Sequence, residues 1–228
     1  MSTPVFTRCI WGDASVPRSQ TKIRDDFRRS VKNQAHLKSI TYCFGRDNYD
    51  FIKSLGFEAT MLHEKGIVYS PASFWFHKLY AWTMMAIQHQ EFLFIDADMR
   101  LTRPLFADFW PTLREKNDVL APLMQRARRR IRWRRDECGN EIDARKLPSA
   151  AFVYFRDAKE YLKVAGDYFD ANPDTTEEIA LAFSMEQVDP WKNAKHYFWT
   201  REPLCVAPCM SALPPDLAKM KGNLFSFR

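Results

Sequence analysis

The sequence predicts an α/β domain in which a mixed, mainly parallel central sheet is flanked by helices. Two observations lead to this prediction. Short apolar runs alternate with segments of helical periodicity through the first half of the chain, and the last of these runs, Glu91–Ile95 (EFLFI), has four consecutive apolar residues. A continuously apolar run between helices is typical of a strand buried on both faces of a parallel sheet. The resulting β-α-β-α-β-α-β order implies right-handed crossovers.

The elements of the first half follow from short-range patterns. Strands are expected at Val5–Trp11, Ser39–Phe44, Phe57–Leu62 and Glu91–Ile95. Helices are expected between them, at Thr21–Leu37, Tyr49–Leu55 and Ser73–His89. The first helix carries an apolar stripe at steps of four, formed by Ile23, Phe27, Val31 and Ala35.

The second half gives weaker patterns. Strands are expected at Asp118–Leu123 and Ala150–Phe155, and helices at Asp157–Tyr168 and Thr175–Gln187. Thr175 or Thr176 is expected to cap the last helix, with Glu177 and Glu178 in its first turn, where the helix dipole favours acids. After residue 190 the chain is rich in proline and predicts no regular element.

Bulk composition narrows the class of protein. The 228 residues fit a single domain, and 46% of them are hydrophobic, which argues against extensive disorder. No uninterrupted apolar run of about 18 residues occurs, so no membrane span is expected. The first residues lack a basic start followed by an apolar run, so no secretory signal is expected. The 5 cysteines are scattered, which suits a reducing cytoplasm.

The strongest chemical signal is the pair Asp96 and Asp98, directly after the apolar strand. Side chains alternate along a strand, so both carboxylates are expected to point the same way. At a separation of roughly 4 Å two such charges repel by about 4 kcal/mol at an effective dielectric near 20. A divalent cation removes this repulsion, and Mg²⁺ or Mn²⁺ accepts one or two carboxylates together with substrate phosphates. The alternative is that the two aspartates only form a solvent-exposed turn and bind no metal.

Two further loops are expected to share one cleft with these aspartates. Ligands of open α/β sheets bind outside the carboxyl ends of the strands. The pairs Gly12-Asp13 and Asp96-Asp98 and the segment 45–47 all follow predicted strands. A phosphatase of the haloacid dehalogenase type also has D-x-D after an apolar strand, but on its first strand, whereas here the motif follows roughly the fourth.

The stretch FHKLYAW…EFLFIDADMRLTRPL resembles the GT-A glycosyltransferases, whose metal-binding D-x-D ends a buried strand and precedes Pro-Leu. The resemblance implies a GT-A-like fold with a Rossmann-like N-terminal half. It also implies one glycosyltransferase domain, in which residues 1–105 bind the nucleotide-sugar and residues 106–228 bind the acceptor. The implied reaction moves a sugar from a nucleoside diphosphate, with a UDP-sugar as first guess and Mn²⁺ or Mg²⁺ as cofactor.

The same resemblance implies roles for the donor-side residues. Asp98 looks like the direct metal ligand, and Asp96 like a ligand that also meets the sugar or ribose. The loop Trp11-Gly12-Asp13 is similar in position to the family's contact with the nucleotide base. Lys78 lies where related enzymes place a cation near the diphosphate, although an ordinary helix lysine is the alternative.

Acceptor-side roles are implied in the same way. Glu178, and as second choice Glu177, resembles the acidic motif that supplies a general base or holds the acceptor hydroxyl. The alternative is that these acids only complement the helix dipole. His196 is the candidate for a further metal ligand. Cys205 and Cys209 offer half of a zinc site, with no second pair at suitable spacing.

A basic segment suggests a polyanionic acceptor. Seven arginines lie in residues 126–135, and the net charge of the chain is +6. Arginine binds phosphate bidentately and an interleaved aromatic can stack on a base, so acceptor-binding roles are expected for Arg128, Arg130, Arg132 and Trp133. DNA carrying hydroxylated bases, as in phage DNA modification, is the first guess, and a cell-surface glycan or lipid-linked acceptor the second. A non-catalytic nucleic-acid-binding module and a solvated basic helix remain alternatives.

Overall fold

The computed structural model describes residues 5–31, 39–68, 76–101, 111, 114, 118–122, 150–172, 175–188, 197–198 and 205–206. Strands of the main sheet are β1 (Val5–Ile10), β2 (Ser39–Phe44), β3 (Glu58–His63), β4 (Glu91–Ile95), β6 (Val119–Pro122), β7 (Phe152–Arg156) and β8 (Tyr197–Phe198). A separate two-stranded ribbon joins β5 (Arg100–Leu101) to β9 (Cys205–Val206). The helices are α1 (Pro17–Val31), α2 (Arg46–Ser54), α3 (Phe76–Gln88), α5 (Lys159–Ala171) and α6 (Glu177–Val188).

The main sheet is mixed and centres on β4. Its strand order is β3-β2-β1-β4-β7-β6-β8. The first four strands of the chain are parallel to one another, whereas β7 runs antiparallel to both β4 and β6. The order 3-2-1-4 is that of the first half of a doubly wound, Rossmann-like sheet. The predicted α/β class with a mainly parallel, mixed sheet is therefore confirmed.

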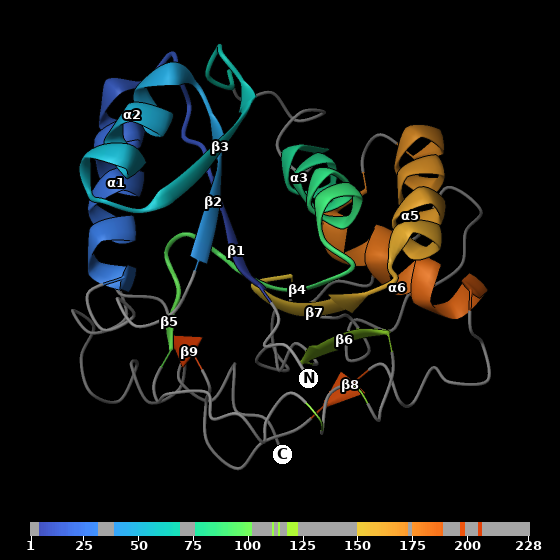
Figure 1. The fold of residues 1–228 in the computed structure, drawn as a ribbon. Helices are drawn as coiled ribbons and strands as arrows, with labels where there is room; N and C mark the ends of the chain where they lie inside the picture. The colour runs from blue at the N-terminus through green and yellow to red at the C-terminus, as the bar shows by residue number, and fades with distance from the viewer. Residues whose placement is uncertain are drawn as a thin grey trace, which may run out of the picture.

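Helices cover the sheet from two sides (Figure 1), with α1 and α2 on one side and α3, α5 and α6 on the other. The alternation of side chains along β1 serves both layers. Cys9 belongs to the larger core, beneath α3, α5 and α6, and Ile10 to the smaller core with Phe27 of α1. Both sides of the central strands are thus buried, as the apolar run of β4 predicts.

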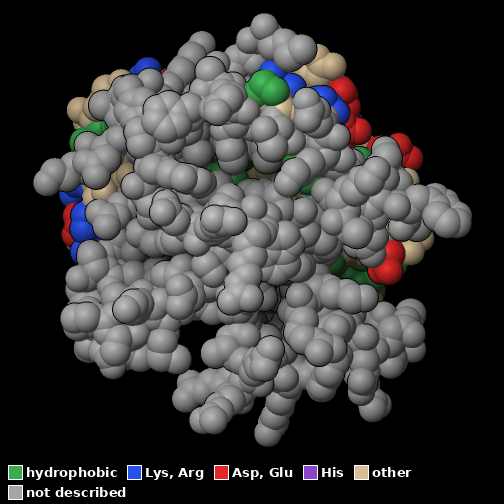
Figure 2. Space-filling view, turned by 90° about the horizontal axis from the view of Figure 1, so that it is seen from below, with side chains coloured by type: hydrophobic (Ala, Val, Ile, Leu, Met, Phe, Trp, Pro, Cys, Tyr) green, Lys and Arg blue, Asp and Glu red, His purple; other side chains and the backbone are tan. Residues whose placement is uncertain are grey.

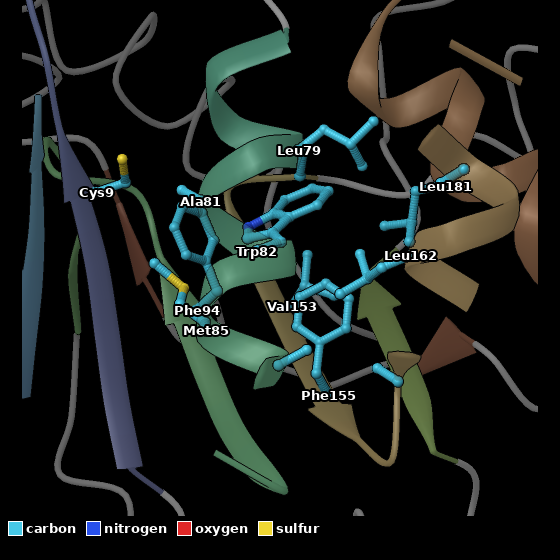
Figure 3. Close-up of a cluster of buried hydrophobic side chains, with 14 of the residues drawn as sticks. Cys9, Leu79, Ala81, Trp82, Met85, Phe94, Val153, Phe155, Leu162 and Leu181 are labelled. Atoms are coloured by element: carbon cyan, nitrogen blue, oxygen red, sulfur yellow. The ribbon is translucent and has the colours of Figure 1, made fainter. Parts of the chain in front are cut away.

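Trp82 is the centre of the larger core (Figure 3). Its side chain is fully buried, and its ring lies 5.5 Å from that of Phe94 on β4 and 5.3 Å from that of Phe155 on β7. Truncating a buried tryptophan typically costs about 3–5 kcal/mol. Lys78 lies one helical turn before Trp82 on the same face of α3, so this packing fixes where Lys78 meets the sheet.

The loops that follow β1, β2 and β3 pack together closely. The Ala14 amide donates to the carbonyl of Ile67 at 2.6 Å. A Cβ on Gly66 would lie 2.7 Å from that of Ala14, and Gly45 has a φ of +92° and would place a Cβ 3.2 Å from Gly66 Cα. Glycine is required where backbones approach this closely. The carboxyl ends of three parallel strands are therefore drawn together at one edge.

Predicted and observed boundaries differ mainly at helix starts. Helix α1 begins at Pro17, before the expected Thr21, and α2 begins at Arg46, directly after Gly45. The apolar stripe marks only the buried turns of a helix, so polar first turns escape it. Strands β5, β8 and β9 were not predicted, because two-residue strands have no periodicity to detect. Residues 32–37 and 73–75 of the predicted helices lie outside the described part.

The view from below shows described side chains mainly at the rim (Figure 2), where both basic and acidic side chains occur. No helix in the part of the chain that the structure describes is long and apolar enough to cross a membrane.

Candidate active site

Asp96 and Asp98 belong to a tight turn at the carboxyl end of β4. The Asp96 amide donates to the carbonyl of Ala151 at 2.9 Å, and the Met99 amide donates to the carbonyl of Asp96 at 3.0 Å. The first bond ties the turn to β7, and the second closes it over residues 96–99. Phe94 points into the larger core. The alternation of the strand therefore directs Asp96 toward the side of the sheet that α3 covers.

Lys78 joins this turn to the start of α6. Its Nζ lies 2.9 Å from Asp96 Oδ1 and 3.0 Å from Glu177 Oε1, and it donates to Asp96 Oδ2 at 3.2 Å. The lysine is only 7% exposed, and Glu177 is only 1% exposed. A buried ion pair needs good geometry to offset desolvation, and here one ammonium bridges two carboxylates. The structure thus brings Lys78, Asp96 and Glu177 together.

The charges in the cluster alter one another's proton affinity. Burial disfavours the charged form of Lys78, but the nearby carboxylates of Asp96, Glu177 and Glu178 more than offset burial, so the Lys78 pKa is raised. Burial raises the pKa of Asp96, while Lys78 opposes that rise. Burial, and then the negative charge of Asp96, raise the pKa of Asp98 to about 6. The raised pKa keeps Lys78 protonated at neutral pH.

Glu177 is placed differently from Glu178. The Ile179 amide donates to Thr176 Oγ1 at 3.4 Å, which makes Thr176 the cap of α6, one of the two expected caps. Glu177 then lies buried in the first turn, with Oε1 on Lys78 and Oε2 buried without a hydrogen-bond partner among the described residues. Glu178 is partly exposed and acts on Lys78 through its charge. The structure therefore favours Glu177, the second choice from sequence, as the acid inside the cluster.

The loop Trp11-Gly12-Asp13 forms the β1–α1 connection. Asp13 Oδ1 accepts hydrogen bonds from the Ser15 amide at 2.9 Å and from Ser15 Oγ at 2.5 Å. The Asp13 amide donates to Ser19 Oγ at 3.1 Å. Trp11 packs, partly buried, against the larger core. These contacts shape the loop, and its expected contact with a nucleotide base remains a prediction.

Several predicted site residues lie outside the described part of the chain. They are the metal candidate His196, the half zinc site residue Cys209, and the acceptor candidates Arg128, Arg130, Arg132 and Trp133. Within the described ranges, no group of three or more His, Cys, Asp or Glu side chains could hold a metal ion. The expected metal site at Asp96 and Asp98 remains a prediction.

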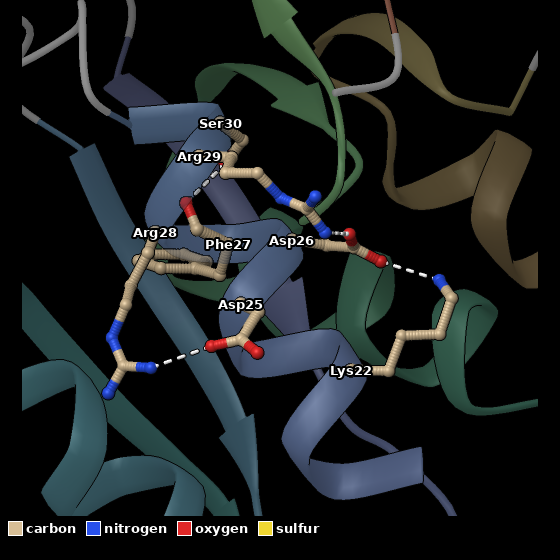
Figure 4. Close-up of polar contacts among 7 residues, drawn as sticks. All are labelled: Lys22, Asp25, Asp26, Phe27, Arg28, Arg29 and Ser30. Carbon is tan, nitrogen blue, oxygen red and sulfur yellow. Dashed lines mark hydrogen bonds and ion pairs between the residues drawn. The ribbon is translucent and has the colours of Figure 1, made fainter. Parts of the chain in front are cut away.

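Two buried residues near the turn were missed at the level of sequence. Arg8 of β1 is only 2% exposed and hydrogen-bonds the turn. Asp26 of α1 is only 1% exposed, receives a bond from Lys22 at 2.6 Å and one from Arg29 (Figure 4), and contributes to the raised pKa of Asp98. A charge inside the apolar run VFTRCI was a detectable signal for Arg8. Asp26 gave no such signal, because acids are ordinary on an amphipathic helix.

No protein-family model matches the chain, and no curated protein sequence matches it significantly. The function is therefore inferred from the fold and from the geometry of this cluster.

Proposed function

We propose that the chain is a metal-dependent glycosyltransferase with a GT-A-like fold, which moves a sugar from a nucleoside-diphosphate donor to a hydroxyl acceptor. One observation carries the proposal. The Asp96–Asp98 turn ends the central strand and is joined through Lys78 to Glu177 at the start of α6. A D-x-D motif alone can be explained as a solvent-exposed turn with no functional role. The same motif beside a buried acid from the second half of the chain has the composition of a reaction centre.

The sheet supports the GT-A-like part of the proposal. A Rossmann-like half ends at β4, and the chain then adds antiparallel β7 beside it. Ligands of such sheets bind at the carboxyl ends of the parallel strands. The aspartates lie at that edge, beside the Ala151 carbonyl that precedes β7. Donor-side and acceptor-side elements therefore meet at one point.

The residues present fit a divalent cation whose coordination sphere is completed by oxygens of the substrate. Mg²⁺ and Mn²⁺ are commonly held by one or two carboxylates plus phosphate oxygens, so a pair of aspartates is a sufficient protein contribution. Asp98 is the better placed of the two aspartates, because Lys78 already occupies both oxygens of Asp96. When bound, the metal supplies charge neutralisation for the departing diphosphate.

The residues of the chain itself have separable roles in this proposal. Lys78 fixes the carboxylate of Asp96 and supplies positive charge near the diphosphate. Lys78 also orients Glu177 through Oε1, which leaves Glu177 Oε2 to accept a hydrogen bond from the acceptor hydroxyl. A carboxylate held by one oxygen and offering the other is suited to deprotonating a hydroxyl. Glu178 adds negative charge at the rim of the cluster.

A thermal-shift experiment tests the proposal. UDP with Mn²⁺ is expected to raise the melting temperature of the wild-type chain, and UDP with EDTA is expected to raise it much less. Asp98→Ala should lose the metal-dependent response. Asp25→Asn is the matched control, because Asp25 is a half-exposed α1 acid paired with Arg28. A wild-type chain that responds to no nucleoside diphosphate or nucleotide-sugar with Mn²⁺ would overturn the proposal.

Turnover gives a second test. A panel of nucleotide-sugars is incubated with the chain, and release of nucleoside diphosphate is measured with and without Mn²⁺. Alanine at Asp96 or Asp98 should reduce release by at least about a hundredfold while circular dichroism shows a folded chain, given that removing one group that stabilises transition-state charge commonly costs 10²–10³. Near-normal release in both variants would reject the assignment of the aspartates.

A further inference from the structure

Arg8 is a buried arginine in the middle of β1, a strand whose other side chains are mainly apolar. Burying a guanidinium costs several kcal/mol unless good hydrogen bonds replace its water. An apolar side chain would contribute to the core at this position without that cost. The presence of arginine here therefore requires a specific set of contacts to explain it.

The contacts of Arg8 converge on the Asp96–Asp98 turn. Its Nη1 lies 3.0 Å from the carbonyl oxygen of Asp96 and 3.0 Å from that of Met99, and it donates to Ser30 Oγ at 3.2 Å. The two carbonyls belong to the first and last residues of the turn that presents Asp98. One guanidinium nitrogen thus binds both ends of this turn from beneath.

The arginine itself is held in place from a second element. Its guanidinium carbon lies 5.9 Å from the centre of the Phe27 ring, within the range of a cation–π contact. Ser30 Oγ, which accepts from Arg8, donates in turn to the carbonyl of Phe27 at 2.8 Å. Both residues lie on α1 and are fully buried. Strand β1, helix α1 and the turn are therefore linked through one side chain.

The charge of Arg8 also acts on the cluster. Arg8 is one of the groups that lower the proton affinity of Asp96, acting with the larger effect of Lys78. Lysine could supply the charge, but the planar guanidinium also supplies several directed donors.

We infer that Arg8 is a positioning residue, which clamps the Asp96–Met99 turn so that the two carboxylates are presented together to a divalent cation. The inference rests on the proposed function, because it assigns the clamp to metal and diphosphate binding. Arg8 is assigned no contact with substrate. It acts through the two backbone carbonyls that it holds.

The test compares two substitutions with a matched control. Arg8→Met keeps much of the volume and removes all donors, and Arg8→Lys keeps the charge but replaces the guanidinium fork. Glu91→Gln is the control, because it disrupts a charged network at the opposite end of β4 and leaves the turn untouched. Each chain is first shown to be folded by circular dichroism and a cooperative melting transition.

Two readouts are taken from each variant. The first is hydrogen exchange of the Met99 amide, which donates to the Asp96 carbonyl and so reports on closure of the turn. The second is the Mn²⁺ concentration that gives half of the maximal UDP-dependent thermal shift. We expect both to change by at least about tenfold in Arg8→Met, less in Arg8→Lys, and not in Glu91→Gln.

The outcomes separate the clamp from the proposed function. Unchanged Met99 exchange in Arg8→Met overturns the clamp, and so does faster exchange with an unchanged half-saturating Mn²⁺ concentration. Equal changes in Glu91→Gln also overturn it, because the effect would then follow stability alone. A wild-type chain with no response to Mn²⁺ and UDP overturns the proposed function, and with it the role of Arg8 in metal binding. That failure is seen before any variant is made.

Discussion

At the scale of single residues, the burial of Asp98, together with the negative charge of Asp96, lowers the stability of the metal-free fold. Asp98 is confined beside Asp96 at the end of a buried strand, and its pKa is raised to about 6 from the ordinary 3.8. An acid with a raised pKa destabilises the folded chain as pH rises, because the unfolded chain ionises more readily. This destabilisation begins near pH 4 and is complete above about pH 6. A bound cation would reverse it.

Asp98→Asn should therefore stabilise the metal-free protein at pH 7. The expected gain in the free energy of unfolding is about 1–3 kcal/mol, since a shift of roughly two pKa units corresponds to nearly 3 kcal/mol before solvent screening. The gain should vanish below about pH 3, where Asp98 is protonated in both states. Urea unfolding in EDTA at the two pH values measures it, and a loss of stability at both would contradict it. With saturating Mn²⁺ and UDP, the wild-type chain should instead be more stable than Asp98→Asn.

Glu177 and Glu178 differ by one position, and their predicted roles differ accordingly. Glu177→Gln removes the carboxylate that Lys78 orients, so transfer should fall by at least about a hundredfold, the usual size of a general-base contribution. Glu178→Gln should reduce transfer less than about tenfold, because Glu178 is partly exposed. Initial rates at saturating donor measure both effects. A larger loss in Glu178→Gln would restore the preference that the sequence alone suggests.

At the scale of elements, a second charged network secures the antiparallel pairing of β4 with β7. Glu91 accepts hydrogen bonds from Arg114 Nε at 2.6 Å and Nη2 at 2.5 Å, and from the Tyr154 hydroxyl at 2.5 Å. Burial raises the Glu91 pKa, but the bonds from Arg114 and Tyr154 outweigh burial, so the pKa is lowered. This network lies at the end of β4 opposite to the aspartates. It can therefore be altered without touching the site.

Glu91→Gln should destabilise the chain at neutral pH by about 1–3 kcal/mol, the usual result of breaking a charged hydrogen-bond network. A lowered pKa means that Glu91 stabilises the fold above its ordinary pKa of 4.5, and that this contribution is lost as pH falls through the folded-state value. The difference between wild type and variant should therefore shrink below about pH 4. Denaturant unfolding at pH 7 and pH 3.5 checks it. A constant difference would show that packing, and not charge, is responsible.

Helices and strands were predictable where the local sequence marks buried positions or the start of a helix. Strand Glu91–Ile95 was predicted with the ends that the structure shows, because its four consecutive apolar residues are bounded by acids on both sides. Helix α6 was predicted within two residues at its start, because Thr176 and the acids after it mark a helix beginning. The pairing of β4 with antiparallel β7 was not predictable. Strand direction depends on contacts between distant segments, and no local pattern encodes it.

At the scale of the whole molecule, the site exists because three distant segments meet. Lys78, Asp96 and Glu177 come from α3, the end of β4 and the start of α6. Asp96 was picked out by local chemistry, and Lys78 and Glu177 were picked out by the resemblance to a known family. Their mutual distances follow from the sheet order and from the packing around Trp82, which a sequence pattern cannot supply. Arg8 shows the converse case. Its charge was visible in the sequence, but its contacts require β1 to lie beside the turn.

The proposal of a polyanionic acceptor also belongs to this scale, because it rests on the net charge of +6 and on the arginines of residues 126–135. If the acceptor is DNA, binding should weaken steeply with salt, because each phosphate contacted releases counterions and lowers log K by about 0.9 per tenfold rise in salt. Changing Arg128, Arg130 and Arg132 to Gln should reduce that slope by roughly three while leaving the UDP and Mn²⁺ response intact.

Changing the exposed residues Lys163 and Arg46 to Gln is the control, since both lie in the described part of the chain and already pair with acids. Fluorescence anisotropy with a labelled duplex between roughly 50 and 200 mM salt gives the slopes. Salt-insensitive binding, or none, would exclude a DNA acceptor and favour the cell-surface glycan or lipid-linked acceptor. An unchanged slope in the arginine variant would remove the basic segment from the proposed acceptor site.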